Sequence, residues 1–366
     1  MTQMAELSEA LLAWFKDHQR TLPWRSDPTP YKVWISEIML QQTQVATVVP
    51  YFERWIDAFP DVDALARAPI EEVLTLWSGL GYYRRAHSLH AAAQAIARDH
   101  AGRLPDTLDG LLGLPGVGRY TAGAIASIAF ELPAPIVDGN VIRVLCRLFA
   151  IDEDPRATPT QRRLWALAES LIPPDRARDF NQSLMELGAL VCTPRAPACA
   201  SCPLADRCRA LALDRVDALP RPPQRKPRRL MAVAAALVVD PEADRCLLLQ
   251  RPEGGLFGGL FEFPTVELVD PVDEASRRVA LDDHLRALGL SVDLGQARPS
   301  LTHTLTHILL TCHPFEARLI GSPPASLPQP FRWVAPDDLD AQPLSSATRK
   351  LIAAALRPPD QGDLWR

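Results

Sequence analysis

Long apolar runs are absent from this sequence. No stretch of about 18 or more uninterrupted apolar residues, the length that crosses a membrane, occurs in its 366 residues. The N-terminus also lacks a basic segment followed by a plain apolar one, which is the pattern of a secretory signal. These absences argue against a membrane-embedded or secreted protein. A cytoplasmic protein with no membrane partner is the expectation.

An excess of positive charge is also missing. The net charge is −5, and residues 1–220 hold 22 basic and 26 acidic side chains. Bulk charge of this sign argues mildly against non-specific binding to nucleic acid. A local binding site can still exist in an acidic protein, so motifs must decide the partner.

Evenly spread cysteines, as in a secreted disulfide framework, do not occur. Four of the seven cysteines lie within 17 residues, with the spacing Cys192-x6-Cys199-x2-Cys202-x5-Cys208. Clustered thiolates suit zinc or an iron-sulfur cluster. Zinc sites usually pair two close dicysteine knuckles, and this loop has only one close pair. We expect the other three to be small buried apolar side chains: Cys146, Cys246 and Cys312.

A proline-rich segment divides the chain. Before it, apolar residues recur at helical spacing between short Pro, Gly and Asp segments. Residues 219–229 hold four prolines and five basic residues, which predicts an extended linker. After it, strand-like runs surround a helix-like stretch, which predicts an α+β domain. The predicted division is a helical domain over 1–218, a linker over 219–230, an α+β domain over 231–356 and a tail over 357–366.

Two glycines in the helical half predict a hairpin over about 111–123. Gly116 and Gly118 permit a tight turn whose backbone N–H groups approach a phosphate. An ordinary turn between helices would carry the same pair. Twenty residues after Gly118 stands Asp138, which is a candidate catalytic carboxylate, a helix N-cap before Val141, or both.

A second carboxylate stands on an apolar helical stretch. Glu37 is flanked by Ile35, Ile38 and Met39, so partial desolvation should raise the pKa of its carboxyl group toward neutrality. A group of that kind can act as a general acid. The alternative is a glutamate that caps the start of the helix.

Together these motifs resemble the MutY-type adenine DNA glycosylases, members of the helix-hairpin-helix superfamily that includes endonuclease III. The resemblance rests on the run from Ser36 to Thr43, the hairpin followed by Asp138, and the 6-2-5 cysteine spacing. It implies a mainly α helix-hairpin-helix domain with a 4Fe-4S cluster on the four cysteines, then an α+β Nudix-like domain. The implied partner is double-stranded DNA with A:8-oxoguanine or A:G mispairs, bound by a monomer at the bacterial nucleoid.

The resemblance also implies a reaction, base-excision repair that hydrolyses the N-glycosidic bond and leaves an abasic site. Glu37 would protonate adenine at N7, and Asp138 would stabilise the oxocarbenium-like sugar. Endonuclease III relatives carry a lysine nucleophile where this chain has Tyr120, so a monofunctional enzyme that uses water directly is expected. Tyr120 and Asn140 would position charge or water. Further family positions would bind the flipped base (Trp24, Arg25, Gln182) or fill the gap beside the lesion (Gln41, Gln42, Tyr82).

The C-terminal half resembles the Nudix-like lesion-recognition domain of the same family. Residues 277–289 lack the glutamate pattern of a Nudix hydrolase, so phosphate hydrolysis is not expected. Residues 302–307 match a family Phe-Ser-His loop that inspects 8-oxoguanine, with Leu305 in place of phenylalanine and with Thr306 and His307 as readers. An exposed β-strand would show the same Thr-His alternation. Because Leu305 replaces the family's phenylalanine, it affects how strongly the domain is expected to prefer 8-oxoguanine over guanine.

Two other functions stay open on the sequence. A bifunctional pyrimidine glycosylase and lyase is opposed by Tyr120 and by the second domain. A non-enzymatic iron-sulfur DNA-binding or redox module would not need Glu37 and Asp138 together. Position 142 is isoleucine where family members often have lysine, which predicts weaker trapping of DNA with activity retained.

Overall fold

The computed structural model describes residues 3–222, 227–269 and 273–355. Contacts divide the chain into two compact units, Met1–Ala68 with Ser88–Arg225, and Pro69–His87 with Lys226–Arg366. The predicted tail and part of the predicted linker lie outside the described residues. Within the described ranges, no helix has the length and apolar character needed to cross a membrane.

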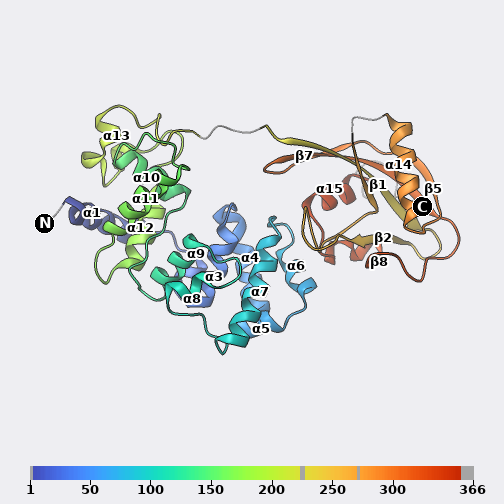
Figure 1. Cartoon of the computed structure of the whole chain (residues 1–366), viewed down its shortest axis with the longest axis horizontal. Helices are drawn as coiled ribbons and strands as arrows, with labels where there is room; N and C mark the ends of the chain where they lie inside the picture. Colours follow the sequence, from blue (N-terminus) through green and yellow to red (C-terminus); the bar gives the residue numbers. More distant parts are fainter. Residues whose placement is uncertain (1–2, 223–226, 270–272, 356–366) are drawn as a thin grey trace. The chain divides into compact units, whose positions relative to one another are not determined.

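The first unit is helical, as the apolar periodicity predicts (Figure 1). Its centre is α12, which packs against α1 and α10. Leu11, Leu145 and Phe180 bury their side chains there. The helices of this unit are α1 Gln3–His18, α2 Pro23–Ser26, α3 Pro30–Leu40, α4 Val45–Ala58, α5 Val62–Arg67, most of α7 Arg84–Asp99, α8 Leu108–Leu112, α9 Arg119–Ala124, a π-helix Ile125–Ala129, α10 Gly139–Leu148, α11 Thr158–Ser170, α12 Ala177–Leu190 and α13 Arg209–Ala212.

The second unit contains a mixed eight-stranded sheet whose main path runs β3-β2-β1-β7-β5. Its long central strands β1 and β7 pair in parallel, and the other pairings are antiparallel. The predicted strand runs are confirmed, with Val239 opposite Cys246 in the first hairpin. The strands are β1 Arg229–Asp240, β2 Arg245–Gln250, β3 Phe261–Glu262, β4 Thr265–Leu268, β5 Val292–Ala297, β6 Leu301–Thr304, β7 Ile308–Leu319 and β8 Phe331–Val334.

Helices cover both faces of this sheet. Alternate residues of β1 point to opposite faces, so Ala235 and Ala236 belong to different cores. The helix α14 (Glu274–Ala287) buries Leu281 and Leu285 in one core. The helix α15 (Ser346–Ala355) buries Leu351 and Ile352 in the other. A sheet covered on both faces agrees with the predicted α+β domain.

A short segment from the helical half of the sequence belongs to this second unit. Residues 69–87 carry α6 (Ile70–Trp77) and the loop that follows it. Ser78 and Tyr83 both donate hydrogen bonds to the carbonyl of Leu344, at 2.8 and 3.1 Å. Arg349 in turn donates to the Ser78 hydroxyl at 2.9 Å. The sheet domain therefore holds the loop that presents Tyr82.

Candidate active site and cysteine loop

Glu37 lies on α3, a helix whose middle is almost entirely buried. Its side chain is 5% exposed, and burial raises the pKa of its carboxyl group to about 7. The hydroxyl of Tyr120 donates a hydrogen bond to Oε2 at 2.5 Å and opposes that rise, whereas the charge of Asp138 adds to it. The carboxyl group can therefore hold a proton near neutral pH, which a general acid requires.

The hairpin places Tyr120 near the start of α9. Gly116 has φ +73°, and a Cβ there would stand 2.4 Å from the Cβ of Ser88, so the turn needs glycine. Gly118 is the N-cap residue of α9, and a Cβ on it would meet open space. The Tyr120 hydroxyl lies 3.8 Å from the sulfur of Met185 as well as against Glu37.

Asp138 is the N-cap of α10. Its Oδ1 accepts the backbone N–H of Val141 at 2.7 Å, and its Oδ2 accepts the side-chain amide of Asn140 at 2.9 Å. Burial raises the pKa of this carboxyl group above its usual value, and these hydrogen bonds limit the rise. Both oxygens are thus oriented by donors, which is the arrangement that favours the ionised form. The capping interpretation of Asp138 is confirmed, and it leaves a catalytic role available.

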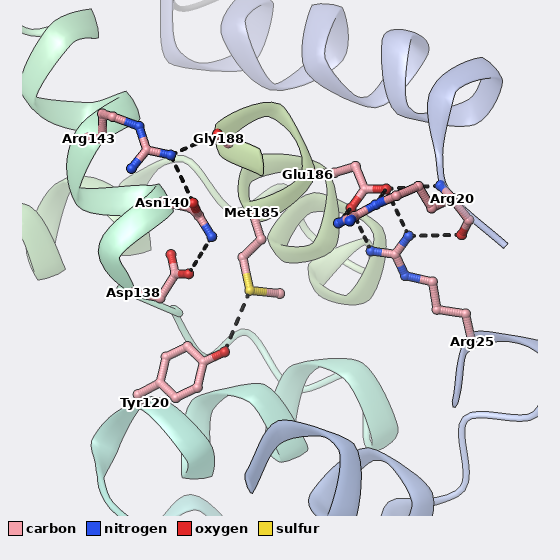
Figure 2. Close-up of polar contacts among 9 residues, drawn as sticks. All are labelled: Arg20, Arg25, Tyr120, Asp138, Asn140, Arg143, Met185, Glu186 and Gly188. Carbon is pink, nitrogen blue, oxygen red and sulfur yellow. Dashed lines mark hydrogen bonds and ion pairs between the residues drawn. The ribbon is translucent and has the colours of Figure 1, made fainter. Parts of the chain in front are cut away.

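Hydrogen bonds join Asp138, Asn140, Arg143 and Gly188 in a chain (Figure 2), which Arg143 extends to the cysteine loop at Cys192. Asn140 accepts a hydrogen bond from Arg143 at 2.8 Å while donating to Asp138. Arg143 also donates to the carbonyls of Gly188, at 2.8 Å, and of Cys192, at 2.6 Å. A side chain on Gly188 would collide with Asn140, so this glycine permits the close approach of α12. The sequence interpretation missed Arg143, whose one signal is its position three residues after Asn140.

The expected base-pocket residues lie on α2 and α12. Trp24 is 6% exposed and its ring stands edge-on to Phe52, with centroids 5.3 Å apart. Arg25 forms an ion pair with Glu186 on α12 at 3.0 Å. Gln182 is half-buried on α12, one turn before Glu186. Glu186 was also missed, and its only signal was an acidic residue within an apolar helical pattern.

The four clustered cysteines line one hollow. Arg147, 2% exposed, also lines it, and its guanidinium lies 3.4 Å from the Cys192 sulfur and 2.7 Å from the carbonyl of Thr193. Four thiols around a single hollow are a donor set that fits an iron-sulfur cluster. Outside this loop, Cys146 and Cys246 are buried as expected, and Cys312 is half-buried against an apolar core.

Two residues of the second unit that are candidates for lesion recognition, Tyr82 and Thr306, contact each other. Thr306 and His307 are exposed in the turn between β6 and β7. Tyr82 has φ +49° and is 45% exposed, and its hydroxyl is hydrogen-bonded to that of Thr306. Gln41 and Gln42 belong to the first unit, where they follow α3; the amide of Gln41 donates to Thr121 at 3.2 Å.

Comparison with known protein families agrees with this geometry. Residues 35–170 match the HhH-GPD superfamily of base excision DNA repair proteins, and residues 192–208 match the iron-sulfur binding domain of endonuclease III. Residues 234–354 match the NUDIX domain. The chain is thus an iron-sulfur DNA glycosylase of the helix-hairpin-helix class, a hydrolase of N-glycosyl bonds, with a Nudix-like second domain.

Individual relatives narrow this class. The chain is 39% identical to the adenine DNA glycosylase of Mus musculus, covering 93% of this chain and 76% of the relative. It is 37% identical to that of Homo sapiens, covering 94% and 72%. A solved thermostable thymine-DNA glycosylase is 30% identical with a TM-score of 0.54, covering 57% of this chain and 97% of that structure. The chain belongs to the adenine DNA glycosylase family and acts in base excision repair of DNA.

Proposed function

We propose that this chain is a monofunctional glycosylase that excises adenine paired with 8-oxoguanine or guanine and leaves the strand intact. The observation that carries the proposal is the pairing of a protonatable buried acid, Glu37, with a hydrogen-bonded carboxylate, Asp138. When two carboxyl groups hydrolyse a glycosidic bond, one acts in its protonated form and the other in its ionised form.

Glu37 supplies the proton. With a pKa of about 7, its carboxyl group can carry a proton near neutral pH. In the reaction the flipped adenine takes this proton at N7, and the C1′–N9 bond breaks with its electron pair going to the base. Tyr120, which donates to Oε2, holds the carboxyl group in one orientation.

Asp138 faces the charge that develops on the sugar. Its two oxygens are held by Val141 and Asn140, so its position does not change as the cation forms. Water then adds to the sugar, its second proton passes to the carboxylate of Glu37, and the abasic site results. A strand-cutting lyase would need an amine nucleophile, and the hydroxyl of Tyr120 cannot form a Schiff base.

The remaining site residues are assigned roles in binding. Cys192, Cys199, Cys202 and Cys208 hold the 4Fe-4S cluster, which when bound cross-links the loop to itself. Backbone N–H groups at Gly116 and Gly118 contact a DNA phosphate. The base pocket is assigned to Trp24, Arg25 and Gln182, and the gap beside the lesion to Gln41, Gln42 and Tyr82.

The preference for 8-oxoguanine is assigned to the turn between β6 and β7. Supporting this, Thr306 and His307 are exposed there, and Thr306 meets the hydroxyl of Tyr82. A hydroxyl group in this place can hydrogen-bond the edge of guanine that oxidation alters. An exposed aromatic side chain beside it can hold an unstacked base step open.

The test is single-turnover excision from duplexes with A:8-oxoguanine, A:G, A:C and thymine glycol, analysed with and without alkali. We expect adenine release from the first two and strand cleavage only after alkali. Thr306→Ala should lower the ratio of the A:8-oxoguanine rate to the A:G rate, whereas Thr302→Ala on the neighbouring strand β6 should not. Strand cleavage without alkali would overturn the monofunctional assignment, and an unchanged ratio in Thr306→Ala would overturn the reader assignment.

A further inference from the structure

The deepest charged group near the proposed base pocket is Glu186, which is 1% exposed. Its carboxylate meets two guanidinium groups side by side (Figure 2). Oε1 accepts from Arg20 Nε at 2.9 Å and from Arg25 Nη1 at 3.1 Å. Oε2 accepts from Arg20 Nη2 at 2.7 Å and from Arg25 Nη2 at 3.0 Å. The backbone N–H of Arg20 adds a fifth bond at 2.9 Å.

This cluster is charged at every working pH. Burial alone would raise the pKa of Glu186, but the hydrogen bonds from Arg20 and Arg25 outweigh it and lower that pKa to about 2. Two guanidinium groups and one carboxylate leave one net positive charge. A buried ionised group keeps its charge only with such partners, so the three side chains form one unit.

The hydrogen bonds leave Arg25 no freedom to turn. Both terminal nitrogens of its guanidinium donate to Glu186, and Nη1 also donates to the carbonyl of Arg20 at 3.0 Å. The side chain of Arg25 is 15% exposed, so solvent offers it little in place of Glu186. If the carboxylate were removed, a largely buried guanidinium would need another anion.

The charge of Arg25 also acts on the proposed acid, Glu37. The charged or titratable groups that act on Glu37 come from three elements: Tyr120 on α9, Asp138 at the start of α10, and Arg25 on α2. Of these, Arg25 is the cation, and its charge already favours the ionised form of Glu37. Glu186 therefore holds the guanidinium whose charge acts on Glu37.

We propose that Glu186 is a positioning residue for adenine excision, which holds Arg20 and Arg25 in place beside the proposed base pocket and so fixes where the charge of Arg25 lies relative to Glu37. The proposal rests on the proposed role of Glu37 as the acid. In this proposal Glu186 does not contact the substrate, because both of its carboxylate oxygens accept hydrogen bonds from the two arginines.

The experiment is the pH profile of single-turnover adenine excision in wild type, Glu186→Gln and Glu186→Asp. Glutamine preserves the shape of the side chain and removes its charge, so a freed Arg25 should stabilise ionised Glu37. We expect the rate of Glu186→Gln relative to wild type to be about fivefold lower at pH 8 than at pH 6 if the pKa of Glu37 falls by about one unit, because the acid loses its proton earlier. Glu186→Asp keeps the charge and should keep the wild-type profile at a reduced rate.

A double variant and a control separate this role from a structural one. Adding Arg25→Gln to Glu186→Gln removes the freed charge, so the profile should return toward its wild-type position although the rate stays low. Glu131→Gln removes the same kind of charge from a half-exposed pair with Arg178 and should change nothing. A uniform loss at all pH values in Glu186→Gln, or a profile still displaced in the double variant, would overturn the proposal.

A second readout does not depend on turnover. The carboxyl stretch of Glu37, identified in infrared difference spectra by its loss in Glu37→Gln, reports the protonation of that group directly. It should disappear at lower pH in Glu186→Gln than in wild type. If the wild-type protein released no adenine, the proposed function would fail. An unshifted carboxyl signal in the folded Glu186→Gln variant would instead count against the inference alone.

Discussion

Removal of the Tyr120 hydroxyl should make the enzyme tolerate alkaline pH better. In Tyr120→Phe the ring still fills its place between Glu37 and Met185, but the donor to Glu37 Oε2 is lost. That hydrogen bond favours the ionised carboxylate, so its loss raises the pKa of Glu37 from about 7. Glu37 acts protonated, and excision should therefore persist to higher pH.

The size of the change follows from the bond. A hydrogen bond to a charged group contributes about 1.5–3 kcal/mol, and one pKa unit corresponds to about 1.4 kcal/mol. The alkaline fall in rate should therefore move up by about one pH unit or more. The ratio of the Tyr120→Phe rate to the wild-type rate should then be about tenfold larger at pH 9 than at pH 6. The absolute rate at pH 6 should decrease, because the carboxyl group is oriented less well.

The assay is single-turnover release of adenine from an A:8-oxoguanine duplex between pH 5.5 and 9.5, with enzyme in excess. Binding to a duplex with a non-cleavable adenosine analogue, measured at each pH, shows that the profile reports chemistry. A ratio that is constant across pH, or that falls as pH rises, would refute the argument. Either result would mean that Glu37 is not the group whose protonation limits the reaction.

Three further results are expected. Cys199→Ser should lower the iron content from about four atoms per chain and destabilise the first unit in thermal unfolding. Cys312→Ser, which lies outside the loop, should leave the iron content unchanged. One zinc per chain in the wild type would contradict the iron-sulfur assignment. Arg143→Gln should slow excision by about tenfold or more in single-turnover assays, since Asn140 loses a charged hydrogen-bond partner; a wild-type rate would show that the chain to Asp138 is dispensable. Tyr120→Lys should give complexes with DNA that borohydride traps, while wild type gives none.

Local sequence patterns predicted the parts of the molecule that depend on neighbours along the chain. The apolar flanks of Glu37 predicted its desolvation, and the pKa of about 7 agrees. The position of Asp138 before Val141 predicted a helix cap, which the structure contains. The resemblance of the cysteine spacing to the family's loop implied an iron-sulfur cluster, and the family comparison confirms the loop. Each of these inferences used residues within one turn or one loop.

Contacts between distant residues were beyond that reasoning. Glu186 forms an ion pair with Arg20, which lies 166 positions away in the sequence. No local pattern indicates that an acidic residue in an apolar helix binds distant arginines. The segment 69–87 joins the sheet domain through Ser78 and Leu344, which are 266 positions apart. The predicted division placed this segment in the helical domain over 1–218, because no local pattern shows which core a segment will join. Such pairings arise from packing and become visible only in the folded chain.

The division of labour between the two carboxyl groups is tested most directly by one measurement. Single-turnover adenine release from an A:8-oxoguanine duplex is compared among wild type, Glu37→Gln and Asp138→Asn, alongside binding to a non-cleavable analogue. Both variants should bind the analogue as wild type does and should lose at least about 10²-fold in rate, because one lacks the proton and the other the charge. A near wild-type rate in Glu37→Gln would show that the acid lies elsewhere, and lost binding in either variant would show that its carboxyl group is structural.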